Sequence, residues 1–432
     1  MRDLIIIGGG PAGCRAAGIA AKAGLKTALF EGRHVGGVCL NEGCIPTKSL
    51  LYSAKIYDYM NGGGARYGVS CVSPILDYAA AVQHKDDVVK KLGAGMRAEL
   101  KKSGVELISE DAVISSRVNG GFEVRTDVTV YIAAKLLICT GSQPMLPPIK
   151  NIERAMTNRE ILALTEAPES LAIIGGGVIG LEMASLFNSA GSRVTVYEMA
   201  EKIAGYFDRE ISDMLQKIYE RKGVTFQLKT TVNDITELDA ENVLVSIGRK
   251  PSIEGLGLEN IGVLTERGAV VTDEFMKTSL PGVFAAGDVN GKSMLAHTAY
   301  REAEVAAANI LGGREIMDYG AIPSIIYTNP EAAGIGHTLD SAREKGINAA
   351  EIKLPMQYSG RFMAENEGDG ICKLVLDGNR LIGAHMLGNP CSEIISTIAA
   401  LMHREITVEQ IKNIVFPHPT VAEIIKEVAF HA

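Results

Sequence analysis

A glycine pattern that occurs twice constrains the fold more than any other feature of this sequence. In the first copy an apolar run, Leu4 to Ile7, leads into spaced glycines, an alanine-rich helix and a second apolar run that ends in an acid. The second copy keeps each of these positions at one constant offset. The repeated positions are Gly8, Gly10, Gly13 and Glu31 in the first copy and Gly175, Gly177, Gly180 and Glu198 in the second.

Each copy is typical of a strand, turn, helix and strand that bind a dinucleotide. The glycines let the backbone approach a pyrophosphate at a helix N-terminus, and the acid holds ribose hydroxyls. Two structural turns without ligands would leave the matched acids unexplained, so we predict two nucleotide sites. Glu198 would repel a 2′-phosphate, which favours NAD over NADP at the second site, although Lys202 lies nearby.

Two cysteines, Cys39 and Cys44, follow the first copy. In an uninterrupted helix their Cα atoms would lie roughly 8.7 Å apart, whereas a disulfide requires less than about 7 Å. If they bond, the helix must be distorted, and Gly43 and Pro46 permit this. Spacing alone leaves three readings open: a redox-active dithiol, two unrelated buried thiols, or half of a metal site whose further ligands are missing. Beyond them, a helical apolar face is predicted at Leu50, Leu51, Ala54, Tyr57 and Met60.

Composition narrows the class of protein. The chain has 432 residues, enough for several domains, and its seven cysteines do not suggest a structural disulfide framework. No apolar run reaches the roughly 18 residues that suggest a membrane span, and the first residues do not resemble a signal peptide. We therefore expect a cytoplasmic protein without a membrane partner. A net charge of −8 argues against nucleic acid.

Weaker signals fill the rest of the chain. Short strand-like runs suggest a small antiparallel addition to the first domain; they are Val105–Ile108, Phe122–Arg125, Val128–Ile132 and Leu136–Cys139. A strand at Val283–Ala286 would bring Asp288 to a helix start, where it either binds a polyol or simply caps the helix. His418 and Glu423 form either a base held by its acid or, more simply, an ordinary surface histidine and its neighbour.

Together these motifs resemble the pyridine nucleotide-disulfide oxidoreductase family over nearly the whole chain. The resemblance implies an α/β fold with two Rossmann-like three-layer dinucleotide-binding domains and an α+β C-terminal dimerisation domain. The implied boundaries are 1–146 for an FAD-binding domain, 147–250 for a shortened NAD-binding domain, 251–318 for a return to the central domain, and 319–432 for the dimerisation domain. It also implies a homodimer.

Site residues and roles follow from the same resemblance. FAD would bind at Gly8, Gly10, Gly13, Glu31, Lys48, Gly141 and Asp288, and NAD at Gly175, Gly177, Gly180, Glu198 and Gly248, with no metal. Cys39 would exchange with the substrate, and Cys44 would face the flavin as a thiolate. Lys48 and Glu182 would pair near the flavin, while His418, oriented by Glu423, would reach the dithiol of the other subunit.

The activity implied is oxidation of dihydrolipoamide with NAD+, with a lipoyl-bearing carrier protein or the lipoyl domain of a multienzyme complex as partner. Other readings are a different NAD(P)H-dependent disulfide reductase, an NADH oxidase and a non-catalytic FAD-binding subunit of a complex. Two departures from the family pattern stand out. The chain passes quickly from Glu198 to Gly248, and Glu42 lies between the cysteines, where its charge is expected to shift their potential.

Overall fold

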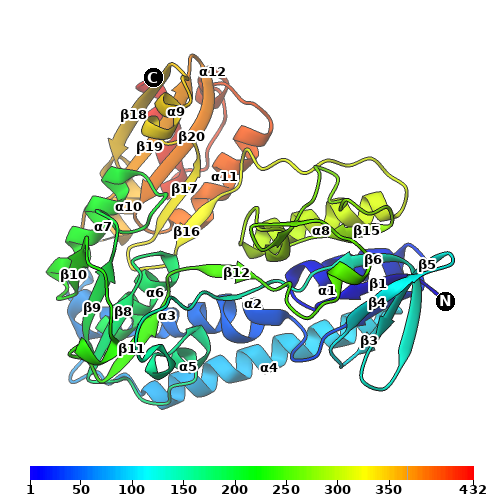
Figure 1. Ribbon diagram of the computed structural model, residues 1–432. Helices are drawn as coiled ribbons and strands as arrows, with labels where there is room; N and C mark the ends of the chain where they lie inside the picture. The colour runs from blue at the N-terminus through cyan, green and yellow to red at the C-terminus, as the bar shows by residue number, and fades with distance from the viewer. Residues whose placement is uncertain (367) are drawn as a thin grey trace.

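The computed structural model describes residues 1–366 and 368–432, which form three domains. In Figure 1 the first domain lies at the right with the N-terminus, the second, in green, lies at the left, and the C-terminal domain, in orange and red, lies above them. The predicted architecture is confirmed: two Rossmann-like domains each contain one glycine copy, and an α+β domain ends the chain.

The first domain is built on a seven-stranded sheet in the order β3-β2-β1-β6-β5-β4, with β15 also paired to β6. Its strands are β1 (Arg2–Ile7), β2 (Thr27–Phe30), β3 (Glu106–Ile108), β4 (Val113–Val118), β5 (Gly121–Arg125), β6 (Val130–Ile138) and β15 (Val283–Ala285). Helices α1 (Pro11–Lys22) and α8 (Ala296–Ile310) pack together against one face of the sheet. Apolar side chains from the segment around Leu258 to Val270 cover the other face.

Strand β6 corrects one prediction. The runs Val128–Ile132 and Leu136–Cys139 were expected to be separate strands, but they belong to a single strand of nine residues. Its first half pairs antiparallel with β5, and its second half lies parallel between β1 and β15. The sequence reads as two runs because the polar Lys135 interrupts the apolar pattern, and the change of neighbouring strands is not visible in the residues of β6 itself.

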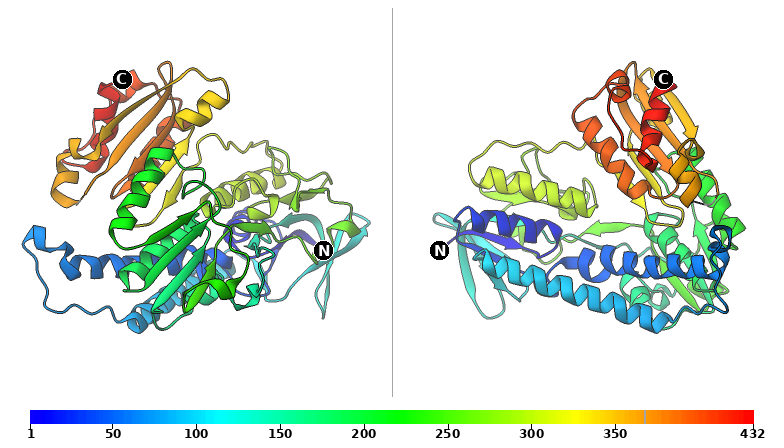
Figure 2. Two further views of the ribbon diagram at one scale, coloured as in Figure 1. Left: turned by 60° about the vertical axis from the view of Figure 1, so that its left-hand side comes forward. Right: turned by 180° about the vertical axis from the view of Figure 1, so that it is seen from behind.

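The cysteine segment forms two consecutive helices that meet at Gly43. Helix α2 (Gly37–Glu42) stops at Gly43, and α3 (Cys44–Asp58) begins at the second cysteine. Leu50, Leu51 and Ala54 are buried as predicted, but α3 ends before Met60, which lies in the following π-helical turn η1 (Tyr59–Gly63). The long helix α4 (Tyr78–Lys102) runs beside α3 (Figures 1 and 2).

The second domain has a four-stranded parallel sheet in the order β10-β9-β8-β11. Its elements are α5 (Asn158–Leu162), β8 (Ser170–Ile174), α6 (Val178–Ser189), β9 (Arg193–Glu198), α7 (Arg209–Arg221), β10 (Thr225–Leu228) and β11 (Asn242–Val245). Only the one-turn helix η4 (Ile235–Glu237) connects β10 to β11, so the domain is as short as its sequence suggests. Strands β7 (Ser142–Pro144) and β12 (Arg249–Pro251) pair antiparallel where the chain passes between the first two domains.

The C-terminal domain has a five-stranded antiparallel sheet in the order β16-β17-β20-β19-β18. The strands are β16 (Ser324–Ile326), β17 (Ala332–Gly336), β18 (Ala349–Pro355), β19 (Ile371–Asp377) and β20 (Arg380–Leu387), and the helices are α9 (Leu339–Glu344), α10 (Gly360–Glu365), α11 (Cys391–His403), α12 (Val408–Lys412) and α13 (Ile424–Phe430). Helices α11 and α13 cover one face, and α7 of the second domain meets the opposite face. Among the described residues, no helix is both long and apolar enough to cross a membrane.

Candidate active site

The two glycine copies fold alike. Gly8 has φ +102°, and a Cβ built on Gly13 would lie only 1.8 Å from the Gly8 carbonyl oxygen. In the second copy Gly175 has φ +109°, and a Cβ on Gly180 would lie 2.1 Å from the Gly175 oxygen. The first glycine thus makes the turn and the third allows the helix to pack on it.

The middle glycine of each copy lies at the start of a helix, where a Cβ on Gly10 would meet only the Gly37 Cα, at 4.0 Å. Gly10 and Gly177 are the N-caps of α1 and α6, and a Cβ on Gly177 would meet nothing within 4 Å. The acids close the turns from the other side: Glu31 accepts a hydrogen bond from the Gly9 amide at 2.8 Å, and Glu198 accepts one from Gly176 at 2.7 Å. Open helix N-termini flanked by acids at strand ends fit a dinucleotide pyrophosphate and ribose.

Both turns open into one continuous cavity of about 1910 Å³ between the first two domains. The cavity is lined by both cysteines, Lys48, Glu182 and Asp288, and by the predicted Gly141 and Gly248. Among the described residues, none beyond Tyr327 lines the cavity, so most of the C-terminal domain lies outside it. The two cysteines therefore lie in the same space as the two glycine turns.

The two cysteines meet across the helix break. Gly43 adopts φ −150° and ψ −109°, which ends α2 and brings the thiol of Cys39 within 2.7 Å of the Cys44 sulfur. This is the distortion that the spacing predicted. Among the described residues no group of three or more His, Cys, Asp or Glu is placed to hold a metal.

The two thiols have very different acidities. The hydrogen bond donated by Cys39 and the nearby Lys48 ammonium together lower the pKa of Cys44 to about 7, against the effect of burial. The same hydrogen bond and burial raise the pKa of Cys39 far above its ordinary value. Cys44 is therefore the thiolate of the reduced pair.

An ion pair beside the dithiol joins the first two domains. Lys48 on α3 donates to both carboxylate oxygens of Glu182 on α6, at 2.9 and 2.7 Å. The backbone amide of Tyr327 also donates to Glu182, at 3.1 Å, and the Lys48 ammonium lies 4.5 Å from the centre of the Tyr327 ring. Glu182 is buried on the nucleotide helix, which sequence reasoning without the family would not have found.

Asp288 is held at the cavity wall by hydrogen bonds. The Ser142 hydroxyl donates to its carboxylate, and Arg249 in turn donates to Ser142 Oγ at 2.7 Å. Burial raises the pKa of Asp288, and these two partners oppose that rise. Asp288 begins a one-turn helix, η6 (Asp288–Asn290), and α8 starts only at Ala296, so Asp288 does not cap the following α-helix.

A buried glutamate, Glu302, stabilises the turn that carries Asp288. Its carboxylate accepts hydrogen bonds from the Gly287 amide at 2.6 Å, from the Asn290 side chain at 2.8 Å and from the Tyr319 hydroxyl at 2.6 Å. Sequence analysis missed this residue. The available signal was a charged residue on the apolar helical face that also carries Ala299 and Ala303.

Glu42, between the cysteines, is neutralised by two arginines. Its carboxylate accepts from Arg33 at 2.7 Å and from Arg159 at 2.6 Å. It is not among the groups that most affect the Cys44 thiol, whose largest electrostatic partners are Lys48 and Glu182. The sequence did not reveal the two guanidinium groups. The shift in potential expected from Glu42 stays a prediction, for a charge that is paired and not free.

Comparison with known families agrees with this geometry. Residues 2–303 match the model described as "pyridine nucleotide-disulphide oxidoreductase", and residues 322–429 match the dimerisation domain of the same family. This chain belongs to the pyridine nucleotide-disulphide oxidoreductase family. It is therefore an oxidoreductase of the flavin-dependent disulfide class, and members of this family use FAD and NAD(H).

Similar proteins in this family are named dihydrolipoyl dehydrogenase. The enzyme of Chlamydia muridarum is 36% identical over 450 residues, covering 100% of this chain and 96% of the relative. That of Geobacillus stearothermophilus is 34% identical over 452 residues, covering 99% and 95%. Among solved structures, the HOCl-induced flavoprotein disulfide reductase RclA from Escherichia coli is 28% identical with a TM-score of 0.88, covering 99% of both chains. LpdA from Mycobacterium tuberculosis, at 23% identity and a TM-score of 0.92 over 100% and 99%, shares the fold.

His418 and Glu423 lie together, and neither lines the cavity of its own chain. The His418 Nδ1 atom is 3.0 Å from Glu423 Oε1, and the backbone amide of Thr420 donates to the other Glu423 oxygen at 2.7 Å. The imidazole side chain is 81% exposed. The pair lies within the segment that matches the family's dimerisation domain.

Proposed function

We propose that this family member oxidises dihydrolipoamide with NAD+ through the Cys39–Cys44 pair. The observation that carries the proposal is the position of that pair beside Lys48 and Glu182, in a cavity that also holds both glycine turns. The similarity to dihydrolipoyl dehydrogenases over the whole chain supports the choice of substrate. A lipoyl-bearing carrier protein or lipoyl domain is the proposed partner.

The proposed binding roles follow the repeat. FAD would be held by the first glycine turn, Glu31, Gly141 and Asp288, and it would supply two-electron exchange between the dithiol and the nicotinamide. NAD would be held by the second glycine turn, Glu198 and Gly248. We also propose the boundaries 1–146, 147–250, 251–318 and 319–432 as the domain division and the cytoplasm as the location of the protein.

NAD is favoured over NADP by the surroundings of Glu198. Its two carboxylate oxygens accept from the Gly176 and Ala200 amides at 2.7 and 2.8 Å, which fixes a negative charge where a 2′-phosphate would lie. Lys202 does not compensate, because its ammonium donates to the carbonyls of Gly205 and Phe207. Lys202 therefore stabilises its own loop and is not free to bind a 2′-phosphate.

In the proposed reaction His418 of the partner subunit takes a proton from one dihydrolipoamide thiol. The resulting thiolate attacks Cys39 Sγ in the Cys39–Cys44 disulfide, and Cys44 leaves as a thiolate stabilised by Lys48. The second substrate thiol then gives up its proton and attacks the substrate sulfur bonded to Cys39. Cys39 leaves as a thiolate and takes up that proton, and the oxidised cyclic disulfide is released. The exchange oxidises dihydrolipoamide by two electrons and reduces the Cys39–Cys44 disulfide to a dithiol. These two electrons finally reach NAD+.

A homodimer is part of this proposal. His418 would act on the dithiol of the other subunit, which accounts for its exposure in a single chain. Glu423 would hold the ring through Nδ1 and leave Nε2 free to accept the proton.

The test is NADH oxidation measured with lipoamide, with oxidised glutathione and with oxygen as separate acceptors. Fast turnover with lipoamide alone is the expected result. Preference for glutathione would indicate another disulfide reductase, and turnover with oxygen alone would indicate an oxidase. No turnover with any acceptor would favour a non-catalytic FAD-binding subunit.

A further inference from the structure

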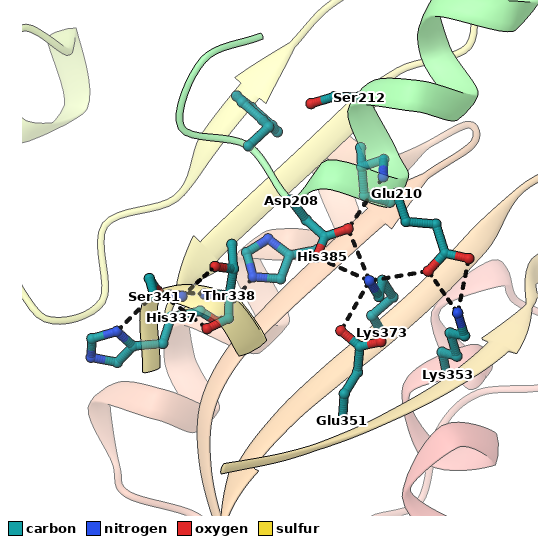
Figure 3. A network of polar contacts seen from close by, with 12 residues as sticks. Asp208, Glu210, Ser212, His337, Thr338, Ser341, Glu351, Lys353, Lys373 and His385 are labelled. Carbon is teal, nitrogen blue, oxygen red and sulfur yellow. Dashed lines mark hydrogen bonds and ion pairs between the residues drawn. The ribbon is translucent and has the colours of Figure 1, made fainter. Parts of the chain in front are cut away.

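A group of ion pairs with a buried centre joins the second domain to the C-terminal domain (Figure 3). We call it the Lys373 cluster, and it consists of Asp208, Glu210, Glu351, Lys353 and Lys373. None of these five residues lines the cavity described above. Asp208 and Glu210 stand at the start of α7, and the other three come from β18 and β19.

Lys373 is the centre of the cluster. Its ammonium donates to both Asp208 oxygens at 2.9 Å, and it lies 2.9 Å from Glu351 and 3.1 Å from Glu210. The Lys373 and Asp208 side chains are only 4% and 8% exposed. Burial alone would lower the pKa of Lys373, but its carboxylate partners raise it above the ordinary value. A charge buried so deeply requires these partners, so the two domains cannot separate here at low cost.

The register of the sheet explains why Lys373 faces the second domain. Its neighbours on β19, Cys372 and Leu374, point into the apolar core beneath α11 and α13. Lys373 therefore points to the opposite face, in register with Lys353 on β18 and His385 on β20. In Figure 3 His385 and Lys373 lie beside Asp208, and Lys353 lies beside Glu210.

Asp208 links this cluster to the second nucleotide turn. It ends the loop 199–208, which begins directly after Glu198 and whose Met199, Ala200 and Gly205 line the cavity. At its centre the loop is tied to the turn by the hydrogen bond from the Ala204 amide to the Gly176 carbonyl, at 2.8 Å. At its end Asp208 caps α7 by accepting from the Ile211 amide at 3.2 Å.

We propose that Lys373 is a positioning residue for the second dinucleotide, acting through Asp208 and the loop 199–208. The sheet of the C-terminal domain thereby sets the position of the cavity wall next to the ribose-binding Glu198. Affinity for the nicotinamide nucleotide then depends on a residue of another domain that never touches it. This inference rests on the second nucleotide site of the proposed function.

The test compares Asp208→Asn with Glu351→Gln in the FAD-loaded protein. Each variant removes one carboxylate charge from Lys373, and asparagine keeps the helix cap of α7. Only Asp208 belongs to the loop that lines the cavity. Lys373→Met is a poorer choice because it would leave buried carboxylates without a counter-ion and endanger folding.

NADH affinity is measured by equilibrium titration, and stability by urea unfolding. We expect both variants to lose stability, but Asp208→Asn alone to weaken NADH binding, by about fivefold or more, in the range of typical couplings between sites. Asp208→Asn should also raise the KM for NADH more than it lowers kcat, while Glu351→Gln keeps the Kd within about twofold, well below such couplings.

Equal weakening by both variants, or none in Asp208→Asn, would overturn the inference while leaving the proposed function intact. A wild-type protein that binds no NADH would overturn both.

Discussion

The Lys48 ammonium lies 2.9 and 2.7 Å from the two carboxylate oxygens of Glu182, which is on the helix of the second glycine copy. The pair connects the dithiol helix α3 to the nucleotide helix α6. Lys48 lowers the pKa of Cys44, whereas Glu182 raises it. The two members of one ion pair thus act on the thiolate in opposite directions.

Substitutions in this pair should move the acidity of Cys44 in opposite senses. In the reduced protein, iodoacetamide should alkylate Cys44 with a midpoint near pH 7, because its pKa is lowered to about 7 and the thiolate population rises as pH rises through that value. Lys48→Met should move the midpoint toward the value of about 8.5 of an ordinary thiol. Glu182→Gln should move it below the wild-type midpoint.

Lys55→Met on the same helix is the matched control and should leave the midpoint unchanged. A shift in the same direction for Lys48→Met and Glu182→Gln would mean that structural disturbance, and not charge, controls the thiol.

Glu198 should determine the choice of nicotinamide nucleotide. Glu198→Ser removes the charge opposite a 2′-phosphate, so the preference for NADH over NADPH should fall at least about tenfold, since juxtaposed like charges cost several kcal/mol. The measurement is kcat/KM with each nucleotide and one acceptor. The repeat offers a control: Glu31→Ser should weaken retention of FAD and leave the nucleotide preference alone. An unchanged preference in Glu198→Ser would remove this residue from the proposed site.

Glu42 should matter more for stability than for the acidity of the dithiol. Glu42→Val breaks partly exposed ion pairs with Arg33 and Arg159, each worth up to about 1 kcal/mol in the free energy of unfolding. Urea unfolding of Glu42→Val, Arg159→Met and the double variant should show coupling between the two positions. The alkylation midpoint of Cys44 should move less than in Lys48→Met, and a shift as large as that one would refute the neutralisation that we describe.

His418 should affect the exchange of thiols with dihydrolipoamide but not the reduction of the protein by NADH. His418→Gln removes a general base, so exchange between dihydrolipoamide and the dithiol should slow by about 10²- to 10⁴-fold. Reduction of the protein by NADH, followed by stopped flow, should keep its wild-type rate. His431→Gln, another exposed histidine near the C-terminus, is the control and should affect neither half. Equal slowing of both halves in His418→Gln would contradict the role of a base for the substrate thiol.

The sequence predicted the parts of this protein that depend on local chemistry. The glycine turns, the break between Cys39 and Cys44 and the short second domain follow from backbone freedom and spacing. Two strands were also predicted to within one residue: the run Phe122–Arg125 became β5, and the run Val283–Ala286 became β15.

What the sequence could not supply are contacts between distant segments. Arg33 and Arg159 converge on Glu42 from two sides, and Lys373 meets Asp208 only after two domains have folded. Strand β6 was divided in two because its change from antiparallel to parallel neighbours is set by the sheet and not by its own residues. Glu302 could be noticed as a charged residue on an apolar helical face, but the sequence did not indicate its three hydrogen-bond partners.

The central claim is that electrons pass between a lipoyl substrate and NAD through Cys39 and Cys44. The most direct measurement is NADH-dependent reduction of lipoamide by Cys39→Ser and Cys44→Ser, with NADH-dependent reduction of ferricyanide, an acceptor that needs no thiol, as the internal control. The account predicts that both variants lose lipoamide reduction while ferricyanide reduction persists. Lipoamide reduction at the wild-type rate in either variant would contradict it.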